Sequence, residues 1–166
     1  MSIAVVLGTS KSDGNTRLVV DSLMSESQAT LFDLADYTFS FFDYTHENRG
    51  DDFLSLIIEL VDFDHIVFAS PVYWYSMSAQ LKVFFDRLSD LLTIEKELGR
   101  QLKGKYCSVV ATGFDKEIPR CFVTPFEMTA SYMHMNFNGY TYLSVQNETD
   151  LENINASTLQ AIKNIT

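Results

Sequence analysis

Two polar loops contain the residues of this sequence that could do chemistry. The first runs from Gly8 to Thr16 and offers four hydroxyls, one side-chain amide, one lysine and two glycines. Backbone N–H groups at the start of a following helix, together with such hydroxyls, can surround a phosphate. The alternative is an ordinary strand-to-helix turn in which Asn15 or Thr16 caps the helix. The residues of this loop alone leave both interpretations open.

The glycine spacing of this loop excludes two common nucleotide-binding motifs. It does not match the G-x-G-x-x-G fingerprint of dinucleotide-binding domains. For the P-loop of ATP and GTP hydrolases, Gly8 and Gly14 are one residue too far apart, and Asn15 replaces the lysine. A hydroxyl-rich site with few cations suits a terminal monoester phosphate, because hydrogen bonds and the helix dipole supply most of its stabilisation. Flavin mononucleotide (FMN) carries such a phosphate, and its ring then needs a stacking platform.

The second loop, Ser70–Ser78, contains a proline and the aromatic residues Tyr73, Trp74 and Tyr75. Aromatic side chains are costly to expose in a loop, since each has a large apolar surface. They either pack on a neighbouring helix or a partner chain, or they line a flat ring such as a flavin.

Strand and helix patterns alternate about five times along the chain. Apolar strand patterns cover 3–7, 65–69, 105–112 and 140–145, with 29–33, 39–44 or both as a further strand. Helix signals mark 16–24, a segment after Asp51, a segment after Ser78, a capping box at 124–127 and another at 149–152. Continuous apolar strands predict a doubly wound parallel α/β sheet covered on both faces. Its ligands would bind beyond the carboxyl ends of the strands, at loops 8–16, 70–78 and 113–118. Segment 89–104 is expected to be a solvated surface insertion.

Length and composition narrow the class of protein. The 166 residues fit one domain spanning 1–166, and 46% hydrophobic with 20% charged residues is typical of a globular fold. A net charge of −10 disfavours binding to nucleic acid or to an anionic membrane surface. The two cysteines and three histidines show no disulfide framework and no metal-ligand spacing. Without a signal peptide pattern or an apolar span of about 20 residues, we expect a cytoplasmic protein.

The second loop resembles the flavin loop of the NAD(P)H-dependent FMN reductase family. The residues that carry the resemblance are Ser70-Pro71-Val72-Tyr73-Trp74, then Ser76-Met77-Ser78-Ala79-Gln80-Leu81-Lys82, then Phe85-Asp86-Arg87. Gly8-Thr9 with Gly14-Asn15-Thr16 is similar to the phosphate loop of that family. Lys103-Gly104-Lys105 before a strand ending Ala111-Thr112-Gly113 is similar to its third element. The resemblance covers most of residues 3–113 and implies a flavodoxin-like fold with a five-stranded parallel sheet.

This resemblance implies an oxidoreductase that passes electrons from NADPH or NADH through FMN to a quinone-like or other small acceptor. It also implies a homodimer. The implied phosphate contacts are Thr9, Lys11, Asn15 and Thr16, with Ser10 and Ser12 as helpers. The implied contacts of the flavin ring are Pro71, Val72, Tyr73, Trp74 and Ser76, with Thr112 and Gly113 near its other edge or the ribityl chain. The cofactor performs the redox step, so no catalytic side chain is predicted.

Three residues depart from the family pattern, and two other functions compete with this one. Lys11 stands where arginine is frequent, Tyr75 where glycine is common, and Phe114 where small residues are usual. The Tyr75 ring could therefore narrow the approach to the flavin. A flavodoxin-like electron carrier would use the same FMN and an acidic docking surface, which the net charge favours and the second loop opposes. An interaction domain that has lost the flavin is supported only by Tyr75 and Phe114.

Overall fold

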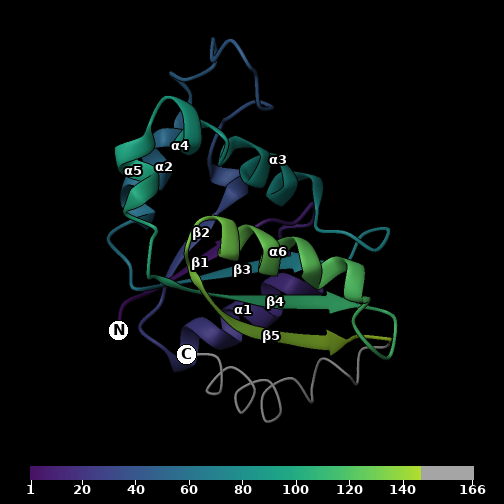
Figure 1. Ribbon diagram of the computed structural model, residues 1–166. Helices are drawn as coiled ribbons and strands as arrows, with labels where there is room; N and C mark the ends of the chain where they lie inside the picture. The colour runs from purple at the N-terminus through teal and green to yellow at the C-terminus, as the bar shows by residue number, and fades with distance from the viewer. Residues whose placement is uncertain (147–166) are drawn as a thin grey trace.

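Five apolar segments form one parallel sheet with the strand order β2-β1-β3-β4-β5, which is flavodoxin-like (Figure 1). The computed structural model describes residues 1–146. The strands are β1 (Ile3–Leu7), β2 (Thr30–Asp33), β3 (His65–Pro71), β4 (Tyr106–Gly113) and β5 (Asn136–Ser144). The predicted fold class is therefore confirmed, whereas the last predicted helix, from Thr149 to about Ile165, lies outside the described residues.

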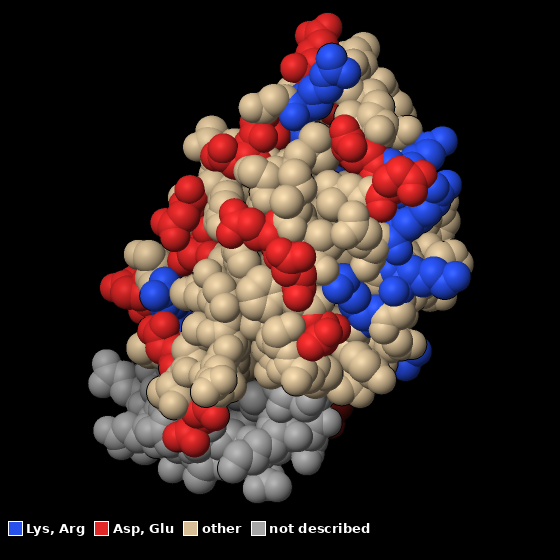
Figure 2. Space-filling model, turned by 90° about the vertical axis from the view of Figure 1, so that its left-hand side faces the viewer, with Lys and Arg blue, Asp and Glu red and all other residues tan. Residues whose placement is uncertain are grey.

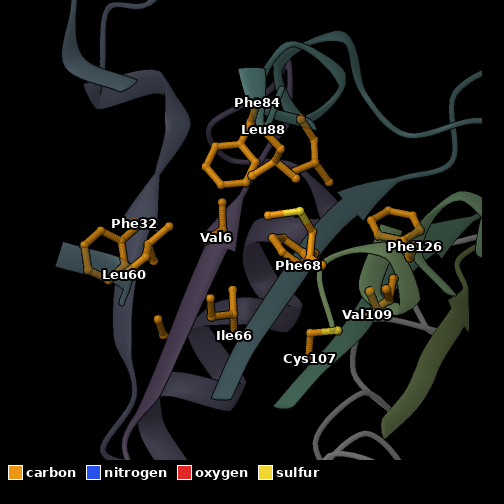
Figure 3. Packing of buried hydrophobic residues seen from close by; sticks show 14 of the residues in the cluster. Val6, Phe32, Leu60, Ile66, Phe68, Phe84, Leu88, Cys107, Val109 and Phe126 are labelled. Carbon is orange, nitrogen blue, oxygen red and sulfur yellow. The ribbon is translucent and has the colours of Figure 1, made fainter. Parts of the chain in front are cut away.

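Alternate residues of the central strands point into two separate cores. The helices are α1 (Asn15–Glu26), α2 (Asp52–Leu60), α3 (Ala79–Arg87), α4 (Asp90–Thr93), α5 (Lys96–Arg100) and α6 (Arg120–Tyr132), with the 3-10 turn η1 (Leu34–Asp36). On one face Val6, Phe68 and Val109 pack with α2, α3 and α6 (Figure 3). On the other face Val5 and its neighbours pack against α1. Helices on both faces explain why the strands are continuously apolar. None of the helices within residues 1–146 has the length and apolar character needed to span a membrane.

Two predicted helix starts are confirmed by their capping bonds. The carboxylate of Asp51 accepts a hydrogen bond from Phe53 N at 3.1 Å, and the hydroxyl of Ser78 accepts one from Leu81 N at 3.2 Å. Each side chain therefore satisfies a backbone donor that the first turn leaves unpaired.

The start predicted for α6 is wrong. The helix begins at Arg120, and Pro125 lies inside it. The Thr124 hydroxyl donates back to the Arg120 carbonyl at 2.9 Å, one turn earlier, so it does not cap the helix. Phe122 and Val123 are buried, and their packing in the core extends the helix towards its N-terminus, past the capping signal at Thr124. β5 likewise begins earlier than predicted, at Asn136, because Gly139 occupies a bulge with φ +95° inside the strand.

A buried arginine decides the structure of segment 37–51. Arg87 has no solvent exposure; its Nε donates to Asp90 at 2.8 Å, and its Nη atoms donate to Asp51 at 2.5 and 3.1 Å. The same guanidinium donates to the Ser40 carbonyl at 3.1 Å, and His46 Nδ1 lies 2.9 Å from Asp90. Because this backbone bonds to side chains rather than to the sheet, 39–44 is not a strand.

His65, at the start of β3, is completely buried. Its Nε2 lies 2.8 Å from the Ser108 hydroxyl, and its Nδ1 has no hydrogen-bond partner among the described residues. Burial lowers the pKa of His65, because a charged imidazole would lose its hydration there.

Candidate functional site

The loops that follow β1, β3 and β4 surround one pocket of about 240 Å³ at the carboxyl edge of the sheet. It is lined by Thr9, Lys11, Gly14, Asn15, Thr16, Pro71, Val72, Tyr73, Thr112, Gly113, Phe114 and Val145. One end is polar and the other is apolar and aromatic. The three loops that were singled out from the sequence therefore meet, as the parallel topology requires.

Four of the predicted contact residues do not line this pocket. Ser10 shares a hydrogen bond with the Gln80 side chain of α3, and Ser12 is exposed. Trp74 is 94% exposed, and Ser76 has its backbone bonded to Tyr73 across a turn. The structure brings the other predicted residues together. It adds Gly14, Phe114 and Val145, which sequence patterns did not single out as contacts.

The polar end of the pocket is built around the start of α1. The N-cap residue is Gly14, which makes no side-chain capping bond, and the first turn contains no acidic residue. Capping by Asn15 or Thr16, the alternative left open by the sequence, is therefore wrong. The free N–H groups of a helix start, together with its dipole, attract an anion. Lys11 adds a positive charge, with the Asp13 carboxylate 3.7 Å away.

A buried serine fixes the first loop to the second. The Ser78 hydroxyl donates to the Gly8 carbonyl at 2.7 Å while it caps α3. Gly8 lies so close to α3 that a Cβ there would be 2.7 Å from Leu81 Cβ. The sequence predicts Ser78 as a cap, but only the fold shows that one hydroxyl also sets the position of the first loop.

A pair of threonine hydroxyls connects the first loop to β4. The oxygens of Thr16 and Thr112 lie 2.7 Å apart, and both residues are buried. Each hydroxyl has one proton, so one proton makes this bond and the second can be donated to a ligand. The Thr112 carbonyl also accepts from Val72 N at 2.8 Å, which attaches the second loop to the same strand.

Side chains at the end of β5 hold the third loop. Tyr142 Oη donates to the Asp115 carbonyl at 2.8 Å, and Gln146 Nε2 donates to the Phe114 carbonyl at 3.1 Å. Burial and the nearby Asp115 carboxylate raise the pKa of Tyr142, so the phenol remains a donor at neutral pH. A Cβ on Gly113 would be 2.7 Å from this phenol oxygen, which explains the need for glycine there.

The second loop ends in a strained two-residue turn. Tyr73 and Ser76 exchange backbone hydrogen bonds of 2.9 and 3.0 Å, and between them Trp74 and Tyr75 have φ of +48° and +65°. This left-handed region favours glycine. It therefore gives a physical reason why glycine is common at this position in the family that the second loop resembles. The Tyr75 side chain is 60% exposed and is not part of the pocket lining. Its carbonyl lies 3.6 Å from Cys121 Sγ in the first turn of α6.

Comparison with known proteins points to one family. Residues 1–149 match the sequence model of the NADPH-dependent FMN reductase family. The chain is 32% identical over 152 residues to YwqN of Bacillus subtilis, assigned as an NAD(P)H-dependent FMN-containing oxidoreductase, covering 84% of this chain and 83% of that protein.

Solved structures agree in fold. The Trp repressor binding protein from Bacillus subtilis superposes with a TM-score of 0.77 at 25% identity, over 99% of this chain and 97% of that chain. General stress protein 14 from Treponema denticola, solved in complex with FMN, gives a TM-score of 0.71 at 14% identity, over 99% and 97% of the two chains.

Proposed function

The chain belongs to the NADPH-dependent FMN reductase family, and from that premise we propose that it binds FMN in the pocket between its three loops. The observation that carries this proposal is the division of the pocket. The uncapped start of α1 and the Thr16–Thr112 hydroxyl pair form one end, and Pro71, Val72 and Tyr73 form the other. A phosphate ester suits the first end and a flat apolar ring the second.

FMN would accept hydride from a nicotinamide and pass electrons to a small acceptor. The chain's own residues bind and orient it. The α1 backbone and Asn15 would donate hydrogen bonds to the phosphate. The hydroxyl proton that the Thr16–Thr112 bond does not use would make a further hydrogen bond to the ligand. Among residues 1–146, Lys11 is the one charged side chain in the lining, so this part of the chain positions no carboxylate or imidazole there as a proton donor or acceptor.

A quinone-like acceptor fits the rim of this site. Phe114 and Tyr73 both line the pocket and are also exposed to solvent, by 77% and 40%. Such rings offer flat stacking surfaces to an aromatic acceptor or to a nicotinamide. We propose in addition that a second copy of the chain covers part of this aromatic surface, including Trp74. Light scattering that gives the mass of a monomer at all concentrations would refute the dimer.

The proposal is tested first with the apoprotein. We expect FMN to bind with quenching of its fluorescence, and excess NADPH or NADH to be oxidised when a quinone is added. Absence of quenching at high protein excess would refute FMN binding. FMN binding without nicotinamide oxidation would instead identify an electron carrier.

The phosphate end is tested by Asn15→Ala, with Ser12→Ala as the matched control because Ser12 is not in the pocket lining. Losing a hydrogen bond to a charged group costs about 1.5–3 kcal/mol. FMN affinity should therefore fall about 10- to 150-fold in Asn15→Ala. Affinity for riboflavin, which has no phosphate, should hardly change. Equal losses for both ligands would show that Asn15 shapes the loop and does not contact phosphate.

A further inference from the structure

A second groove, of about 610 Å³, lies between α4, α5 and the turn that follows α6. The first turn of α6 adjoins the flavin loop through Cys121, whereas Tyr132, its last residue, lines the groove. The 13 residues of α6 span about 20 Å at 1.5 Å per residue. The groove is therefore well separated from the FMN pocket, and the reaction at the flavin does not use it.

The groove combines an apolar wall with a positively charged rim. Leu92, Tyr132 and the buried Met133 supply apolar surface, while Lys96, Arg100 and Lys103 are exposed around it. Together these side chains match a ligand that has apolar anchors and negative charges. This part of the chain was expected to be a solvated surface insertion, and the exposed Lys96, Arg100 and Lys103 confirm that expectation. It also packs on the core, because Asp90, Leu91 and Gly99 of α4 and α5, and Leu102 after α5, are buried.

Positive charge in this groove is unusual for so acidic a chain. The sequence has 12 Lys and Arg against 22 Asp and Glu, and the groove gathers three of those cations within residues 96–103. Arg100 pairs with Glu97, but within residues 1–146 neither Lys96 nor Lys103 forms an ion pair. Figure 2 looks onto the side of the molecule that carries α4 and α5. Its blue side chains gather mainly along the right-hand edge, whereas red ones are spread over the face.

Contacts within the chain hold the backbone of the groove in place. Gly99 lies against α4 so closely that a Cβ would be 2.5 Å from the Leu91 carbonyl oxygen. The turn after α6 is fixed by a bond of 2.9 Å from Gly104 N to the His134 carbonyl. A preformed groove lowers the entropic cost of binding, since little of the protein needs to be ordered.

We propose that this groove docks an acidic segment of a partner protein that carries Asp or Glu side chains around leucine-like anchors. Charge complementarity selects an acidic occupant, since long-range attraction to this part of an otherwise negative chain requires negative charge. The apolar wall selects a segment with hydrophobic anchors over a simple anion. An anionic bilayer is a poorer fit, because the apolar surface lies in a concave groove that a flat bilayer surface cannot enter.

The test uses the full chain and a short fluorescein-labelled peptide of glutamates with two leucines four positions apart. Fluorescence anisotropy should show binding that weakens as salt is added. The double charge reversal Lys96→Glu/Lys103→Glu should weaken it about tenfold or more. The matched control Lys82→Glu/Lys116→Glu changes the net charge equally but lies outside the groove, and should weaken it far less. Leu92→Ser should weaken the leucine peptide and leave a glutamate–serine peptide unchanged.

Thermal melts of each variant show that the fold is retained, and amide chemical shifts locate the bound peptide. Perturbations confined to residues around α5 and Tyr132 support the proposal. Equal losses in the two double variants would show general electrostatic attraction and overturn it. Absence of peptide binding, or groove-dependent binding to phosphatidylserine vesicles in its place, would also overturn it.

Discussion

Replacing Tyr75 by glycine should make the protein more stable than replacing it by alanine. Tyr75 has φ +65°, next to Trp74 at +48°, in a turn closed by the two Tyr73–Ser76 backbone bonds. A residue with a Cβ costs roughly 1–2 kcal/mol in this left-handed region. Glycine removes that cost. It also loses more conformational entropy on folding than alanine does, which offsets about 0.5–1 kcal/mol of the gain.

The alanine variant separates the backbone from the ring. Both substitutions remove the same phenol, which is 60% exposed, so the loss of ring contacts cancels when the two variants are compared. The remaining difference is the backbone strain. We therefore expect the free energy of unfolding of the glycine variant to exceed that of the alanine variant by about 0.5–1 kcal/mol. In a chain of 166 residues, each kcal/mol of stability shifts the melting temperature by roughly 2–4 °C.

Thermal melts and urea titrations of the two variants measure this difference. If the Tyr75→Ala variant is as stable as the Tyr75→Gly variant, or more stable, the assignment of strain to position 75 is refuted. Because the Tyr75 ring is not in the pocket lining, stopped-flow reduction of the flavin should proceed at a similar rate in both variants. A large rise in rate for both would instead show that the ring restricts access to the flavin.

Three further predictions concern His65, Arg87 and the contact between Gly113 and Tyr142. His65 has a lowered pKa when folded, so its contribution to stability is complete above the unfolded value of about 6.5 and is lost as pH falls. Urea titrations between pH 7 and 5 should therefore show wild type losing more free energy of unfolding than His65→Leu, by at most about 2 kcal/mol; equal losses would contradict a lowered pKa. Arg87→Ala removes the guanidinium that pairs with the buried Asp90 and the partly buried Asp51, and should cost about 3–5 kcal/mol. Lys82→Ala in the exposed pair on α3 should cost less than about 1 kcal/mol; equal losses would contradict the role of burial. Gly113→Ala should lower both the melting temperature and FMN affinity through its clash with the Tyr142 hydroxyl, and Tyr142→Phe in the same chain should restore part of both; additive losses would exclude that clash.

The amino-acid sequence alone determined the order of the elements and the edge of the sheet where the site lies. Apolar strands such as Ile3–Leu7 and capping side chains such as Ser78 act over a few residues, so their patterns remain visible in one dimension. Parallel strands place the loops after them at one edge, and for that reason Thr9, Pro71 and Thr112 could be expected to meet.

Only the tertiary structure decided where individual side chains point and how the loops are joined. The Thr16–Thr112 hydroxyl bond joins residues 96 positions apart in the chain, and no local pattern encodes it. The start of α6 and the helices α4 and α5 depended on which side chains find space in the core, which overrode the local signals at Thr124 and in 89–104. Trp74 is exposed in a turn with a left-handed backbone that the Tyr73–Ser76 backbone bonds close, and its residue type does not indicate that conformation.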